Sequence, residues 1–133
     1  NIPFVASITP TSASSKLLVQ MMITCDMSTT HGTFATAKKT TGGVTTEPAV
    51  GDVASSRHRV TTGSNDNGSS SFRNMYIMFV DTAGTTNQID YGFTLSHNDN
   101  STLTIFLNYS NSDADASYTG RGVSSITVTE FSE

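Results

Sequence analysis

Serine and threonine make up 41 of the 133 residues, whereas only 18 residues are charged. They recur at every second position of apolar runs, as in Ser-Ile-Thr-Val-Thr from Ser125 to Thr129. Threonine is β-branched and fits a pleated strand, and its hydroxyl can face water or a neighbouring chain without the desolvation cost of a charge. The sequence therefore favours half-buried β surfaces, which suit display and assembly better than chemistry.

Apolar residues also recur with a period of two, which predicts strands and no helices. The inward-facing residues of the segment 17–25 would be Leu17, Val19, Met21, Ile23 and Cys25, and those of the segment 88–96 would be Ile89, Tyr91, Phe93 and Leu95. Eight strands are predicted, at 2–8, 17–25, 32–39, 57–62, 72–80, 88–96, 102–109 and 122–131. The stretch 40–56 would hold one short edge strand or none.

Clusters of Gly, Pro, Asn, Asp and Ser separate these runs, as turns require. Short strands at this spacing predict an all-β fold, an antiparallel β-sandwich that is most simply a jelly roll of about eight strands. Residues 1–133 form a single domain, since no linker or repeat divides them. Because the chain begins at Asn1 and not at Met, we expect it to be part of a longer protein.

Composition also limits the partners and cofactors. The single cysteine, Cys25, cannot form an internal disulfide, and no Cys/His cluster offers a metal site, so no metal or other cofactor is expected. A formal net charge of −4 without a basic stripe argues against nucleic acid. No apolar stretch approaches the roughly 18 residues of a membrane helix, so membrane insertion is not expected.

Two loops each contain the sequence Asn-Asp-Asn: Asn65, Asp66 and Asn67 in one, and Asn98, Asp99 and Asn100 in the other. Because successive loops of an antiparallel arrangement alternate between its two ends, these two loops should share one end. The loops 81–87 and 110–119 should lie at the other. The six Asn and Asp residues are therefore candidates for receptor binding, although Asn and Asp are also favoured in turns for their own backbone contacts.

Candidates in the loop 110–119 are Asp113, Asp115 and Tyr118. The segment from Asn111 to Asp115 has the alternate-oxygen spacing that hard cations favour, but it lacks the turn glycine and the distal glutamate of a calcium loop. A solvated loop is the alternative interpretation.

Other positions predict contacts between subunits. The number of outward-facing apolar residues exceeds what a small sandwich would expose. Burying them between copies would remove an exposed apolar patch. They are Leu18, Met22, Tyr76, Met78, Val80 and Phe106. Arg57 and Arg59 share one face of the predicted strand 57–62. These two arginines could bind an anionic glycan, or they could form salt bridges with Asp52 and with a neighbouring subunit. We favour the contact with a neighbouring subunit.

Catalytic chemistry is not indicated. The sequence has no Gly-x-Ser-x-Gly elbow, and Cys25 falls within an apolar strand, where it would pack as a small hydrophobe. No two carboxylates form a recognisable pair of the kind that glycoside hydrolysis needs. We therefore expect no enzyme activity.

Three segments carry a resemblance to a known family: ITPTSASSKLLV (8–19), GDVASSRHRVT (51–61) and YTGRGVSSITVTEF (118–131). They resemble a domain of virion structural proteins in marine tailed phages, which is similar to domains in some large algal viruses. The resemblance spans nearly the whole chain. It implies a β-sandwich that trimerises at the distal, C-terminal end of a tail fibre or other surface appendage of the virion.

The resemblance further implies a non-enzymatic domain that assembles with itself and with other virion proteins. Its expected partner outside the virion is a host-surface receptor, either a glycan or an outer-membrane protein. One alternative is a decoration or capping protein of a capsid or appendage, without a receptor. A second alternative is a depolymerase of host polysaccharide.

Overall fold

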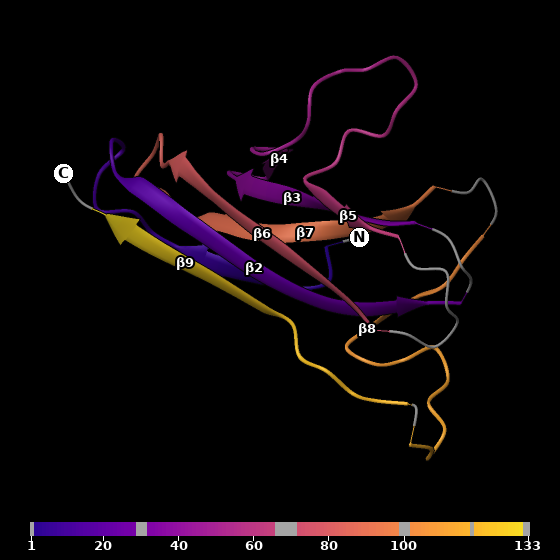
Figure 1. Ribbon diagram of the computed structural model, residues 1–133. Helices are drawn as coiled ribbons and strands as arrows, with labels where there is room; N and C mark the ends of the chain where they lie inside the picture. Colours follow the sequence, from indigo (N-terminus) through magenta and orange to yellow (C-terminus); the bar gives the residue numbers. More distant parts are fainter. Residues whose placement is uncertain (1, 29–31, 66–71, 99–101, 118, 132–133) are drawn as a thin grey trace.

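The computed structural model describes residues 2–28, 32–65, 72–98, 102–117 and 119–131. Within these ranges the chain is all-β, with nine strands and no helix (Figure 1). None of the described segments is therefore a helix that could cross a membrane. The strands are β1 (Val5–Ile8), β2 (Lys16–Met27), β3 (Thr33–Thr41), β4 (Val44–Thr46), β5 (Thr62–Ser64), β6 (Arg73–Thr82), β7 (Ile89–His97), β8 (Ile105–Leu107) and β9 (Ser125–Phe131).

The strands form two antiparallel sheets. In the first, β7 lies between β1 and β3, and the far edge of β3 is shared by β4 and β5. In the second, β2 is central, β6 pairs along one edge, and β8 and β9 share the other. Three pairs are nested in the sequence, because β3–β5 lies within β2–β6, which lies within β1–β7.

The core lies between the two sheets, as the period of two predicts. All five inward-facing residues predicted for β2 are buried, as are Ile89, Tyr91 and Phe93 of β7. Leu95 is partly buried against the same cluster. The rings of Phe4 and Phe93 pack edge to face, with their centroids 5.3 Å apart. The predicted all-β, sandwich-like arrangement of two antiparallel sheets is therefore confirmed.

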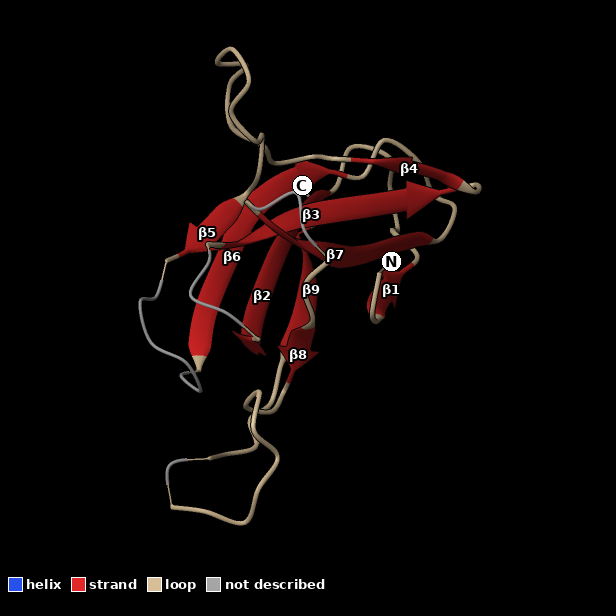
Figure 2. Cartoon of the chain, turned by 90° about the vertical axis from the view of Figure 1, so that its right-hand side faces the viewer, coloured by secondary structure: helices blue, strands red, loops and turns tan. Residues whose placement is uncertain are grey.

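The predicted strand at 57–62 is wrong, because only Thr62 from this segment joins the sheet. Residues 47–61 instead form a protruding loop, here called the 47–61 loop, between β4 and β5 (Figure 2). The Gly51 N–H donates to the Val60 carbonyl at 3.2 Å and closes it. Ser55 has a φ of 53°, which turns the chain back on itself. The segment 57–61 has one apolar side chain, Val60, and therefore offers little surface for burial against the core.

The predicted positions of the last two strands also need correction. β8 and β9 run in the same direction along one edge of β2, and residues 108–124 leave the sheet between them. In this segment, here called the 108–124 excursion, the Gly122 N–H donates to the Asn108 carbonyl at 2.7 Å. Asn108 has a φ of 69°, which asparagine tolerates better than most residues and which ends β8.

Residues 110–119 therefore do not lie at the end opposite the Asn-Asp-Asn loops. The Asn108 N–H donates to the carbonyl of Thr24, close to the end of β2 that leads toward Gly32. Figure 1 shows the excursion emerging beside that same end. The prediction of alternating ends assumes that β8 and β9 run in opposite directions as neighbouring strands. Because both instead run in the same direction along one edge of β2, the segment between them leaves and returns on the same side of the sheet.

A polar network ties the two sheets together at the other end. The buried Tyr91 hydroxyl of β7 donates to Asp81 Oδ2 of β6 at 2.7 Å, and Lys39 Nζ of β3 lies 2.8 Å from the same oxygen. Burial and the neighbouring Asp81 raise the pKa of the Tyr91 phenol far above its ordinary value. Tyr91 therefore remains a neutral donor.

Replacing Tyr91 with phenylalanine is expected to lower the free energy of unfolding by about 1–3 kcal/mol, because Asp81 loses a buried donor while the ring still fills the core. Urea denaturation would measure the loss. The control is Thr86→Val, which removes an exposed hydroxyl from the loop between β6 and β7, away from the sheet faces; its change should stay within about 0.5 kcal/mol. Equal effects of the two substitutions would contradict a role for the buried hydroxyl.

Candidate interaction surfaces

Three neighbouring rows of outward-facing side chains on the second sheet are uncharged, and the next row, at the start of β2, contains Lys16. In the three uncharged rows, Met22 lies opposite Tyr76 and Ser125, Gln20 opposite Met78 and Thr127, and Leu18 opposite Val80 and Thr129. None of these nine residues is charged. They are called here the outer face of β6–β2–β9. Association through this face would bury no charge, so it would avoid the largest cost of desolvation.

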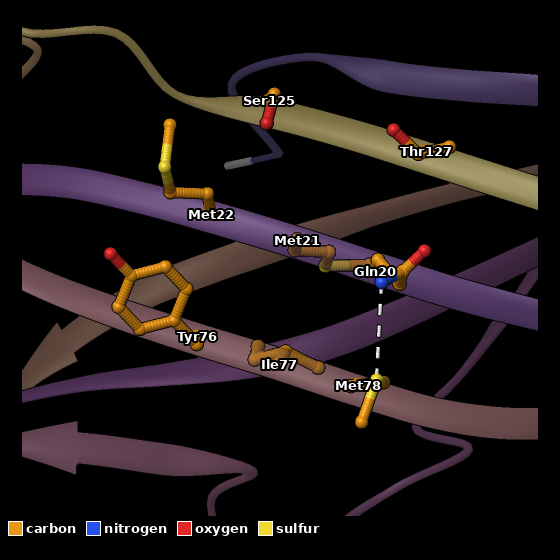
Figure 3. Close-up of a pocket in the computed structure, with 8 residues that line it drawn as sticks. All are labelled: Gln20, Met21, Met22, Tyr76, Ile77, Met78, Ser125 and Thr127. Atoms are coloured by element: carbon orange, nitrogen blue, oxygen red, sulfur yellow. Dashed lines mark hydrogen bonds between the residues drawn. The ribbon is translucent and has the colours of Figure 1, made fainter.

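Apolar side chains dominate the middle of this face. Tyr76, Met78 and Val80 are 67%, 71% and 63% exposed. A shallow groove of about 390 Å³ lies between β6, β2 and β9 (Figure 3). The Gln20 amide nitrogen approaches the Met78 sulfur at 3.9 Å across it. Large exposed apolar residues gathered on one sheet face are typical of a surface that another molecule covers.

The five predicted interface residues do not lie on one surface. Tyr76 and Met78 are on the outer face of β6–β2–β9. Phe106 of β8 is half-buried and packs on its own chain, with its ring centroid 5.3 Å from that of Tyr109. Arg57 and Arg59 are exposed on the 47–61 loop, where Arg59 Nε donates to the Gly51 carbonyl at 2.9 Å. Among the described residues, no carboxylate pairs with either arginine, Asp52 included.

Asn65 and Asn98 lie together at one end of the molecule, as alternating loops predict. The Gly32 N–H donates to Asn98 Oδ1 at 3.1 Å, and the Asn98 N–H donates to the Gly32 carbonyl at 3.3 Å. A Cβ atom on Gly32 would lie 2.4 Å from Asn65 Oδ1, so Asn65 reaches the same glycine. The Asn98 side chain is thus used in a backbone contact, as the turn interpretation expects. Asp66, Asn67, Asp99 and Asn100 lie outside the described residues.

The tip of the 108–124 excursion is held by its own side chains. Arg121 Nη2 donates to both oxygens of Asp113, each at 2.7 Å, and both side chains are exposed. Asp115 is exposed as well, and Tyr118 lies outside the described residues. In the part of the chain that the structure describes, no three His, Cys, Asp or Glu side chains are grouped to hold a metal. The Arg121 guanidinium is therefore the charged partner of Asp113.

A buried carboxylate that sequence reasoning missed fastens the excursion to the sheet. Asp26 on β2 is fully buried, and its oxygens accept the backbone N–H groups of Met27 and Asn111, both at 2.7 Å. The Asn111 amide nitrogen also donates to the Met27 carbonyl at 3.2 Å. The sequence did offer a signal for this contact, because Asp26 is the only acidic residue within the long apolar run 17–27. A carboxylate buried in such a run requires strong hydrogen-bond partners.

Cys25 is a core residue without the features of a nucleophile. Its side chain is fully buried, and this burial raises the pKa of the thiol to about 11; Arg73 lowers it and Asp26 raises it to lesser extents. At pH 8 a thiol with this pKa has about a hundredfold less thiolate than one at the ordinary value of 9.0.

Cys25 in the native protein is therefore expected to react with iodoacetamide at pH 8 at least a hundredfold more slowly than in urea-unfolded protein. Mass spectrometry would follow the added mass. Raising the pH toward 11 should accelerate the native reaction, because the thiolate is the reacting form. Equal rates in the native and unfolded states would show that the thiol is accessible and ionised.

The chain was compared with protein-family models, curated proteins and solved structures. No family model, curated protein or solved structure matches it. The resemblance to phage appendage domains therefore rests on the three sequence segments alone.

Proposed function

We propose that this chain is a non-enzymatic virion domain at the distal end of a tail fibre or similar surface appendage. It forms a trimer through the outer face of β6–β2–β9, and it contacts a host-surface glycan or outer-membrane protein through the end that carries Asn65 and Asn98. The observation that carries this proposal is the uncharged, apolar outer face, because a display domain that stands alone has no need of one.

The strand pairing supports a jelly roll. The pairs β1–β7, β2–β6 and β3–β5 are nested in the sequence, and successive pairs alternate between the two sheets. This is the pattern of a long antiparallel ribbon folded onto itself, which gives the two Greek keys of a jelly roll. Such a fold holds its loops at two opposite ends of rigid strands.

The outer face supports assembly of identical copies. Its uncharged side chains need no complementary charge on a partner, so a second copy of the same face fits it. A closed ring with cyclic symmetry lets every copy bury this face in the same way. The family resemblance supports three copies.

The end with Asn65 and Asn98 supports contact with a polar ligand. Both residues are exposed and carry amide groups, which donate and accept hydrogen bonds without the desolvation cost of a charge. The long strands β2 and β6 run to this end and hold it at a distance from the opposite end of the two sheets. A neutral or weakly charged glycan has the matching donors and acceptors.

A competition experiment tests the proposal. Purified domain added to host cells before infection should block adsorption of the parent virus, and Asn65→Ala should weaken the block more than Asn87→Ala, its control in the loop between β6 and β7. Unchanged adsorption would favour a decoration protein without a receptor. New reducing ends or falling viscosity of host polysaccharide would favour a depolymerase.

A further inference from the structure

Two protruding segments lie beyond opposite edges of the outer face of β6–β2–β9. The 47–61 loop leads into β5, which lies against β6. The 108–124 excursion leaves between β8 and β9, on the opposite edge of β2. Figures 1 and 2 show the two segments projecting to opposite sides of the molecule.

The β5 end of the 47–61 loop and the base of the excursion lie at the same level along the strands. β5, which ends the 47–61 loop, pairs with Thr33–Ala35 at the start of β3. The excursion is fastened to Thr24 and Asp26 near the end of β2. The start of β3 and the end of β2 both lie near Gly32, so the β5 end of the loop and the base of the excursion are in the half of the molecule that carries Asn65 and Asn98. The other end of the loop starts from β4, which pairs with Lys39–Thr41 at the far end of β3.

The exposed charges of the two segments are opposite in sign. The 47–61 loop carries Arg57 and Arg59, and neither is paired with a carboxylate of the described residues. Glu47, at the start of this loop, is paired with Lys38 of β3, and Asp52 offsets one of the two arginine charges, so a net positive charge of about one remains. On the excursion, Asp113 is paired with Arg121, whereas Asp115 is exposed and has no ion-pair partner among the described residues.

We propose that Arg57 and Arg59 of one copy contact the acidic tip of the 108–124 excursion of the next copy, with Asp115 as their main partner. This contact rests on the assembly proposed above. In a ring whose axis follows the strands, the β6 edge of each copy meets the β8–β9 edge of its neighbour, and heights along the strands are preserved. The charged contact then fixes the orientation of neighbouring copies, while the apolar face supplies most of the affinity.

Charge reversal in a double-mutant cycle tests this contact. The Arg57→Glu and Arg59→Glu chain should dissociate at about tenfold higher protein concentration than the wild type, and Asp115→Arg should have a similar effect. All three substitutions in one chain should restore the wild-type value to within about threefold, because the two segments are again opposite in charge. Analytical ultracentrifugation across a concentration series would measure this.

A matched control separates the contact from net charge. Asp90→Arg, on β7 of the other sheet, adds the same charge as Asp115→Arg and should not rescue the Arg57→Glu and Arg59→Glu chain. Unchanged assembly after either reversal, or rescue by Asp90→Arg, would overturn the charged contact. If Met78→Glu still dissociates the copies in that case, the proposed assembly face stands; a monomeric wild type would overturn both.

Discussion

Met78→Glu is expected to convert the assembled protein into folded monomers. Met78 lies in the middle row of the outer face of β6–β2–β9 and is 71% exposed in the single chain, so a glutamate there leaves the core untouched. Between copies, the same carboxylate would be buried without a partner, which costs several kcal/mol per copy. Light scattering coupled to gel filtration would report the mass, and circular dichroism the fold.

Two valines of similar exposure provide a matched control for this prediction. Val80 on the outer face is 63% exposed, and Val44 on β4 of the other sheet is 66% exposed. Val80→Glu should dissociate the copies, whereas Val44→Glu should leave the assembly unchanged. Dissociation by both, or by neither, would show that the outer face is not the assembly surface.

Phe93→Ala is expected to lower the free energy of unfolding by about 3–5 kcal/mol, through lost burial and the cavity that remains. Phe93 is fully buried between the sheets and packs edge to face on Phe4. A loss of this size is a large share of the 5–15 kcal/mol that stabilises a typical domain. Urea denaturation in the monomeric Met78→Glu background would measure it without a contribution from assembly.

Phe131→Ala in the same background is the control, since Phe131 on β9 is 52% exposed. Its loss should be about 1 kcal/mol or less, because much of its ring already contacts water. Similar losses for the two phenylalanines would contradict the position of the core between the sheets.

The core could be predicted from the sequence because one physical signal dominates there. In β7 the apolar residues alternate strictly, and in β2 every odd position from Leu17 to Cys25 is apolar, so a strand with one face in the core has a single register that buries this set. Leu17 to Cys25 and Ile89 to Phe93 are buried as the pattern predicts. The shared end of Asn65 and Asn98 followed from the antiparallel rule, since the strands before them are neighbours of β3.

Other features depend on tertiary contacts that leave no local pattern. The run 57–62 has a strand-like alternation, but its backbone groups are satisfied within a loop, at Gly51 and Val60. The strand-like segments β8 and β9 do not reveal that they share one edge of β2. The contact that holds the excursion outside the sheet joins residues far apart in the sequence, because Asp26 accepts the backbone N–H of Asn111, 85 residues along the chain.

The mass of the wild-type protein in solution tests the central claim, assembly through the outer face of β6–β2–β9, most directly. Each chain has a mass of 14.1 kDa. Light scattering coupled to gel filtration at micromolar concentration should give three times this mass, about 42 kDa. A clean peak at the mass of one chain would contradict the proposed assembly.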